Sequence, residues 1–212
     1  MGAAPALVNT TLQLAERNGQ RCAGPVLLSG LVIGVGVVVL SSEVLGQSSR
    51  FSIELLALLV LQLIGPLLVS VLAMALLLPR WLERAERIGS KAWKQSAPAA
   101  ALAGALLMLL FLTAALLGGV LMTPRNDFLI ELQDLLSSLQ VQHILRTLVR
   151  CSVFLGLMCI WCQRRGLIER QRGISPAVTV SNQLMEGLMV GLLLKLLWVL
   201  GLNAIATGGV IP

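Results

Sequence analysis

The sequence contains few charged residues and even fewer aromatic ones. Of its 212 residues, 12% are charged and 4% are aromatic, and tyrosine is absent. A soluble domain usually has about twice that charged fraction, so this chain has too few charges to cover a core of its size with a polar surface. Hydrophobic residues make up 57% of the chain, and its mean hydropathy is +0.88. The composition therefore predicts an integral membrane protein.

Recognisable catalytic and metal-binding motifs are also lacking. His143 is the only histidine, and no nucleophile with an orienting acid lies near it in the sequence. No GxxxxGK[ST] phosphate-binding loop occurs. Cys159 and Cys162 form a CxxC pair, but a zinc site would need about two further soft ligands, which Cys22 and Cys151 are poorly placed to supply. We therefore predict that the chain is not an enzyme and holds no cofactor or metal.

Five stretches are long and apolar enough to cross a bilayer, since a spanning helix needs about 20 such residues. Lipid offers no partner to a free backbone N–H or C=O, so each stretch must be helical. We therefore expect an all-α integral membrane protein in which residues 1–212 form a single transmembrane domain. The predicted spans are residues 24–40, 53–78, 97–122, 144–161 and 184–205.

The formal charge of +6 is distributed unevenly along the chain. In a soluble protein it would suggest nucleic-acid binding, but here the basic residues flank the apolar stretches. Lysine and arginine collect in residues 17–21, 80–94 and 164–172, whereas residues 43–50 and 125–134 hold one arginine each beside acidic residues. Basic connectors stay in the cytoplasm. This alternation predicts a cytoplasmic N-terminus and an outer C-terminus, and it argues against a nucleic-acid partner.

Three segments next to the spans have apolar residues at helical spacing with charges between them. The clearest is Arg80–Lys94, which reads RWLERAERIGSKAWK and is typical of an amphipathic helix at the cytoplasmic interface. A similar period in Asn126–Gln142 predicts an interfacial helix on the outer side. Leu7–Arg21 is a weaker candidate for an N-terminal interfacial helix.

Charges and a proline inside the spans mark a possible substrate cavity. Lys195 lies near the middle of the fifth span, where a charge costs about 2.5–3.5 kcal/mol on insertion scales. It should therefore face protein or a wet cavity. Arg146 and Arg150 lie one turn apart in the fourth span, and we expect Arg146 to extend to the interface. Gly65–Pro66 interrupts the second span, which predicts either a packing kink or a bend that shapes a cavity.

Three segments resemble a known family of membrane proteins. They are Pro25–Gln47, which contains a glycine-rich first span, QLIGPLLVSVLAMA at Gln62–Ala75, and Asp127–Gly166. In these segments, and in the order of its parts, the chain resembles a remote or degenerate member of the MlaE/YrbE permeases. These are the membrane subunits of ABC transporters that act on lipids together with MCE proteins.

The resemblance implies a permease subunit in a bacterial inner membrane. It would pair with a second permease chain, identical or homologous, and work with a cytoplasmic ABC ATPase, a periplasmic MCE lipid-binding protein and a membrane phospholipid. The ATPase would dock on the segment after the second span. The implied coupling residues are Arg80, Glu83, Arg84, Glu86 and Arg87. The candidate cavity residues are Leu61, Gln62, Gly65, Pro66 and Lys195.

Two other functions remain open at this stage. The family's acidic segment after the second span is replaced by apolar residues at Leu76–Leu78, and its paired arginines are missing from Ile174–Val190. These losses favour a non-transporting structural or assembly subunit. The buried charge of Lys195 would also suit an ion-coupled secondary transporter.

Overall fold

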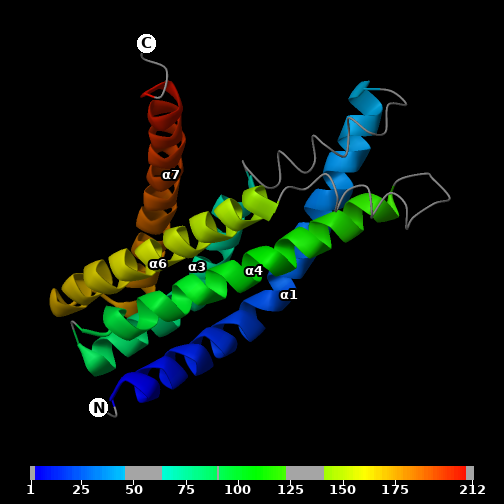
Figure 1. Cartoon of the computed structure of the whole chain (residues 1–212). Helices are drawn as coiled ribbons and strands as arrows, with labels where there is room; N and C mark the ends of the chain where they lie inside the picture. The colour runs from blue at the N-terminus through cyan, green and yellow to red at the C-terminus, as the bar shows by residue number, and fades with distance from the viewer. Residues whose placement is uncertain (1–2, 46–63, 90, 123–140, 209–212) are drawn as a thin grey trace.

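The computed structural model of the protein describes residues 3–45, 64–89, 91–122 and 141–208, with side chains described over residues 9–40, 64–89, 91–122 and 144–201. Within these ranges every regular element is an α-helix (Figure 1). Each of the five described helices is long and apolar enough to span a membrane, which confirms the predicted fold class. The helices are α1 (Ala3–Leu45), α3 (Gly65–Ile88), α4 (Trp93–Leu121), α6 (Val141–Gln171) and α7 (Pro176–Gly208).

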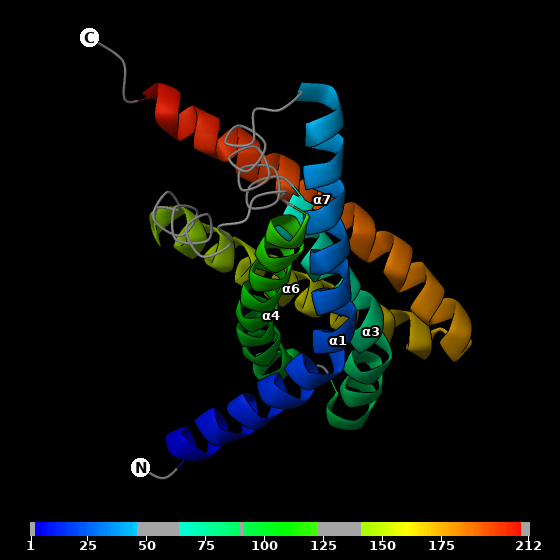
Figure 2. The ribbon, with the colours of Figure 1, turned by 90° about the vertical axis from the view of Figure 1, so that its right-hand side faces the viewer.

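The helices extend beyond the predicted spans at the end that carries most of the basic residues. The predicted interfacial helix at Leu7–Arg21 and the first span are one helix, α1, which changes direction along its length (Figure 2). Pro25 lies inside α1 and cannot donate the backbone hydrogen bond to residue 21, which is a sufficient cause for a bend. The change from polar to apolar residues therefore marks a bend and not a break.

The segment predicted as a separate cytoplasmic helix, Arg80–Lys94, also differs from expectation. Helix α3 runs through Pro79 to Ile88, and Trp93 already begins α4. The break falls at Gly89, which has φ +81° and donates its N–H to the carbonyl of Ala85 at 2.8 Å. This backbone region favours glycine. The spans α3 and α4 are therefore joined by a tight turn at the end of the bundle that carries most of the basic residues.

Two predicted features lie partly or wholly outside the described residues. The expected outer interfacial helix, Asn126–Gln142, overlaps the described chain only at its last two positions. The first part of the second span, including Leu61 and Gln62, is not described either. The described part of that span begins at Gly65, with Pro66 in the first turn of α3.

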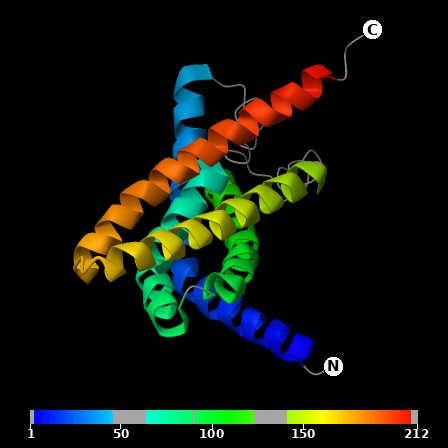
Figure 3. The same ribbon diagram turned by 90° about the vertical axis from the view of Figure 1, so that its left-hand side faces the viewer.

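Helix α4 lies between α1 and α6, and α3 packs on the far side of α6 from the viewer (Figure 1). The core between them is aliphatic and rich in methionine. Its largest fully buried side chains include Phe111, Phe154, Met74, Leu77, Leu107, Met108 and Met158. Helix α7 forms one edge: it leaves α6 at their shared turn and diverges from it toward the opposite end (Figure 3). Helices α6 and α7 are thus closest at their shared turn and farther apart toward their other ends (Figure 3).

Candidate functional site

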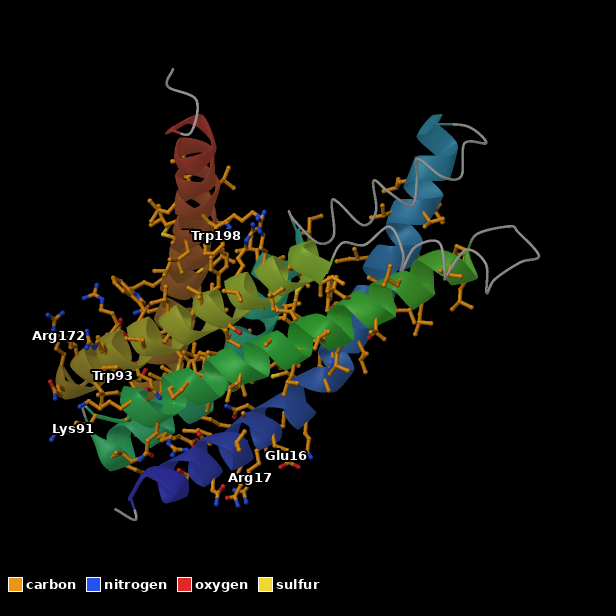
Figure 4. All side chains as sticks on the ribbon, in the orientation of Figure 1. Glu16, Arg17, Lys91, Trp93, Arg172 and Trp198 are labelled. Carbon is orange, nitrogen blue, oxygen red and sulfur yellow. The ribbon has the colours of Figure 1, made fainter. Side chains whose placement is uncertain are left out.

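The basic connectors come together at one end of the bundle. Figure 4 shows Lys91, Trp93 and Arg172 near one another where α3 turns into α4 and α6 turns into α7. We call this region the basic end, which the charge alternation of the sequence predicts to lie in the cytoplasm. Its cationic residues are Arg17, Arg80, Arg84, Arg87, Lys91, Lys94, Arg164, Arg165, Arg170 and Arg172.

The five predicted coupling residues of α3 fall on two different faces. Arg80, Glu83, Arg84 and Arg87 follow helical spacing of three and four residues, so they share one face, and all four line a hollow beside α1. Glu86 lies away from that hollow and forms an ion pair with Arg170 of α6. One face of the α3 end is therefore open and basic, while another is tied to α6.

The hollow has a volume of about 390 Å³ and is formed by α1, α3 and the first turn of α4. We call it the arginine hollow. Arg84 is held in its wall because its Nη2 donates to Oε1 of Gln95 at 3.1 Å. Arginine dominates its polar lining, with Glu83 as the one carboxylate among the lining residues. These are Leu14, Arg17, Asn18, Arg80, Trp81, Glu83, Arg84, Arg87, Ile88 and Ser96.

Helices α3, α6 and α7 are linked by polar contacts at the basic end. The fully buried Gln183 donates from Nε2 to Oε1 of Glu169 at 3.0 Å, and so joins α7 to α6. Gln163 Nε2 donates to the carbonyl oxygen of Trp81 at 3.2 Å, and so joins α6 to α3. Together with the Glu86–Arg170 ion pair, these contacts hold the three helix ends at fixed positions.

Glu186, an acid near the start of the fifth span, also has a partner here. Its carboxylate accepts hydrogen bonds from Nε and Nη2 of Arg165 at 3.3 and 3.4 Å. Both side chains are partly exposed, at 46% for Arg165 and 32% for Glu186. The pair neutralises the negative charge that Glu186 brings to the fifth span.

A second hollow, of about 450 Å³, lies between the α3–α4 turn and α6. The ring of Trp93 lines it, with the guanidinium of Arg164 5.1 Å and the ammonium of Lys94 6.0 Å from the ring centre. Such stacking is favourable by about 0.5–1 kcal/mol at exposed sites. Trp93 thus orients two cations around the turn that begins α4.

The predicted cavity residues that the structure describes lie in two separate places: Gly65 and Pro66 on α3, and Lys195 on α7. Gly65 and Pro66 are buried in the first turn of α3. The Pro66 carbonyl accepts a 2.6 Å hydrogen bond from Oγ of Ser70, which also lies 3.6 Å from the thiol of Cys151 on α6. These groups close the α3–α6 contact. They lie in packed protein, while Leu61 and Gln62 are outside the described residues.

Lys195 is half-buried on α7, and Arg150 of α6 lies near enough to act on it electrostatically. The guanidinium of Arg150 stacks 5.1 Å from the centre of the Trp198 ring, which meets Phe154 edge-on at 6.3 Å. Two cations from different helices thus meet where α6 and α7 begin to separate. The sequence identified both residues but did not predict that they would be neighbours.

The four cysteines are free thiols, and all four are buried. Among the described residues, no group of three or more histidine, cysteine, aspartate or glutamate side chains could hold a metal ion. The side chain of His143 lies outside the described set. Cys159 and Cys162 lie in the apolar core and pack with residues of α3 and α7.

The fold defines a multi-pass helical membrane protein. A scan against protein-family models finds no match to the chain, and a search of curated proteins finds no significant similarity. The class therefore rests on the described helices and their composition, and the family resemblance stays a prediction.

Proposed function

We propose that the chain is the permease subunit of an ABC-type lipid transporter in a bacterial inner membrane. In this proposal it pairs with a second permease chain, a cytoplasmic ATPase docks at the basic end, and an MCE lipid-binding protein acts at the other end. The observation that carries the proposal is the exposed α3–α4 turn and its mechanical connection to the rest of the bundle.

The turn offers an exposed, basic surface of the kind that the ATPase could bind. Arg87, Ile88 and Lys91 are exposed on either side of Gly89. Behind this surface, Glu86 is paired with Arg170, and the carbonyl of Trp81 is bound by Gln163. A force applied to the turn would therefore be transmitted to α6 as well as to α3 and α4.

A lipid substrate fits the exposed apolar face of α7. Only 11% of the most apolar window of α7 is buried within the described structure, compared with 50% for α4. The exposed residues of α7 are chiefly leucine and methionine, which suit contact with acyl chains or with a second permease. Helix α7 diverges from α6 away from their shared turn (Figure 3). This supports α7 as the side of the bundle that faces lipid or the second permease chain.

The test begins with co-expression of the chain with the ATPase and MCE protein expected to be encoded beside it. Charge reversal at the turn, Arg87→Glu with Lys91→Glu, should reduce co-purification of the ATPase on the order of tenfold or more, because close opposite charges at an interface contribute several kcal/mol. In proteoliposomes the same variant should lose ATP-dependent transfer of a fluorescent phospholipid to the MCE protein.

The matched control is Arg146→Glu, an exposed arginine at the far end of α6, which should retain the ATPase. Unchanged ATPase association in the double variant would refute the coupling role of the turn. Retained assembly without any ATP-dependent lipid transfer by the wild-type complex would instead favour a structural subunit.

A further inference from the structure

The arginine hollow combines four of the predicted coupling residues of α3 with Arg17 of α1, which none of the roles above requires. Four arginines converge on it from two helices: Arg17 from α1, and Arg80, Arg84 and Arg87 from α3. One carboxylate, Glu83, is part of the same lining. Like charges brought together repel one another, so this arrangement favours an anion between them.

The wall of the hollow also contains buried hydrogen-bond donors. The Trp81 indole and the Ser96 hydroxyl belong to residues that are 3% and 1% exposed. Within the described part of the chain, neither Trp81 Nε1 nor Ser96 Oγ has a hydrogen-bond partner. A buried donor without a partner destabilises the fold unless a ligand or water accepts its hydrogen bond. A ligand with several acceptor oxygens would therefore suit both the charges and the donors.

The level of the hollow in the bundle indicates where that ligand comes from. Arg80 follows Pro79 at the end of the apolar run that includes Leu78, and Arg17 precedes the apolar part of α1. Tryptophan and arginine at the end of an apolar run are typical of the headgroup level of a bilayer. Leu14 and the half-exposed Ile88 add apolar surface to the same lining. The hollow thus has a polar centre and an apolar margin at the membrane surface.

We propose that the arginine hollow binds the phosphate of an anionic phospholipid in the cytoplasmic leaflet. Arginine suits this ligand because its planar guanidinium can donate two hydrogen bonds to one phosphate. The bound headgroup would bridge the N-terminal half of α1 to the basic end of α3. Because the ligand is resident, this role is separate from transport and does not depend on the proposed function.

The test compares lipid binding by the purified full-length chain in detergent. Phosphatidylglycerol would be titrated against a phosphatidylcholine background, with bound lipid counted by native mass spectrometry. Arg17→Gln should lower the affinity for phosphatidylglycerol by roughly tenfold, since it removes a charge-assisted hydrogen bond to the phosphate. Arg80→Gln changes a second lining residue, one outside the Arg87 and Lys91 docking test, and gives a second variant if the first does not fold.

Arg21→Gln is the matched control, because Arg21 is exposed one turn further along α1 and does not line the hollow. It should retain wild-type affinity. Equal binding by the wild type, Arg17→Gln and Arg80→Gln would overturn the proposal, as would an equal loss in Arg21→Gln, which would indicate diffuse surface charge.

Two further arms identify the source of the anion. Inorganic phosphate should compete poorly with phosphatidylglycerol, and competition at equal concentration would assign the hollow to a free anion. Addition of the ATPase should leave the bound lipid in place. Its release would assign the hollow to an acidic segment of the partner. Loss of lipid binding with intact ATPase association, by contrast, supports the headgroup site and leaves the proposed function unaffected.

Discussion

The two edges of the bundle are built in different ways. At one edge, α1 packs on α4 through glycines that bring the backbones together. At the other, α7 meets α6 through side chains, including the Gln183–Glu169 hydrogen bond and the Phe154–Trp198 ring contact. The first contact brings backbone against backbone. The second runs through side chains: a Cβ added to Gly187 or Gly191 of α7 would meet the side chain of Met74 or Met158.

The glycines of the α1–α4 edge leave no room for a side chain. A Cβ atom added to Gly34 would lie 2.0 Å from the carbonyl oxygen of Ala115, and one added to Gly30 would lie 2.6 Å from that of Phe111. From the other helix, a Cβ on Gly118 would lie 2.5 Å from the carbonyl oxygen of Leu31. Membrane helices associate through such close packing, because lipid removes the hydrophobic drive between them.

The α7 edge has no comparable contact along its exposed face. That face carries Met185, Met189, Leu192, Leu193, Leu196, Leu197 and Leu200. In a bilayer these side chains can remain in lipid at no cost. The difference between the edges teaches that α1 and α4 act as a fixed pair, whereas α7 is a more loosely fastened helix, held by separate side-chain contacts from Gln183 to Trp198.

The largest predicted effect comes from breaking the α1–α4 edge. Gly34→Ala places a methyl group where the Ala115 carbonyl lies, so the two helices must separate. We expect a loss of about 1–3 kcal/mol, the usual range for overpacking. Thermal unfolding of the purified chain in bicelles, followed by tryptophan fluorescence, measures it.

Gly36→Ala is the control in the same helix, because a Cβ at Gly36 meets nothing within 4 Å. It should be neutral, or stabilising by up to about 1 kcal/mol through higher helix propensity. Equal effects of the two substitutions would mean that the close approach at Gly34 does not hold this edge together.

The fold could be predicted from sequence because lipid allows few solutions. Apolar length was enough to predict five helices that could span a membrane. The same reasoning did not distinguish Gly34 from Gly36, since both are glycines in one apolar run. The spacing of Gly30 and Gly34, four residues apart on one helix face, was the available signal for close packing. Their partners on α4 depend on helix rotation, which composition does not specify.

The candidate site was predicted in part. The basic segment after the second span lies at one end of the bundle, as the charge pattern required. Its division into a face toward α1 and a face toward α6 could not be predicted, because Arg17 and Arg170 are distant in sequence. Arg17 was missed as a site residue, since it was assigned to a separate interfacial helix. In the structure α1 is continuous and brings it to Arg80.

A smaller effect should follow from loosening the α7 edge. Gln183→Leu removes the donor that binds the buried carboxylate of Glu169, and the unsatisfied acceptor should cost about 1–3 kcal/mol. Because α7 contributes little to the α1–α4 core, we expect local release of α7 before global unfolding. Hydrogen exchange of α7 amides in nanodiscs measures this.

Asn182→Leu changes the neighbouring exposed residue and should leave exchange in α7 unchanged. If Gln183→Leu accelerates exchange equally in α1 and α4, the two edges are not independent. The distinction between a fixed pair and a loosely fastened helix would then fail.

The smallest effect is expected for the exposed ion pair at the same edge. Arg165→Gln removes the partner of Glu186, but both side chains are partly in solvent, and such pairs contribute about 0–1 kcal/mol. The loss should shrink further in high salt, because mobile ions screen exposed charges. Thermal unfolding at low and high ionic strength measures it. A loss larger than that from Gln183→Leu, or one that salt leaves unchanged, would show that α7 is fastened by this charge pair. In that case the buried Gln183–Glu169 hydrogen bond would be the secondary contact.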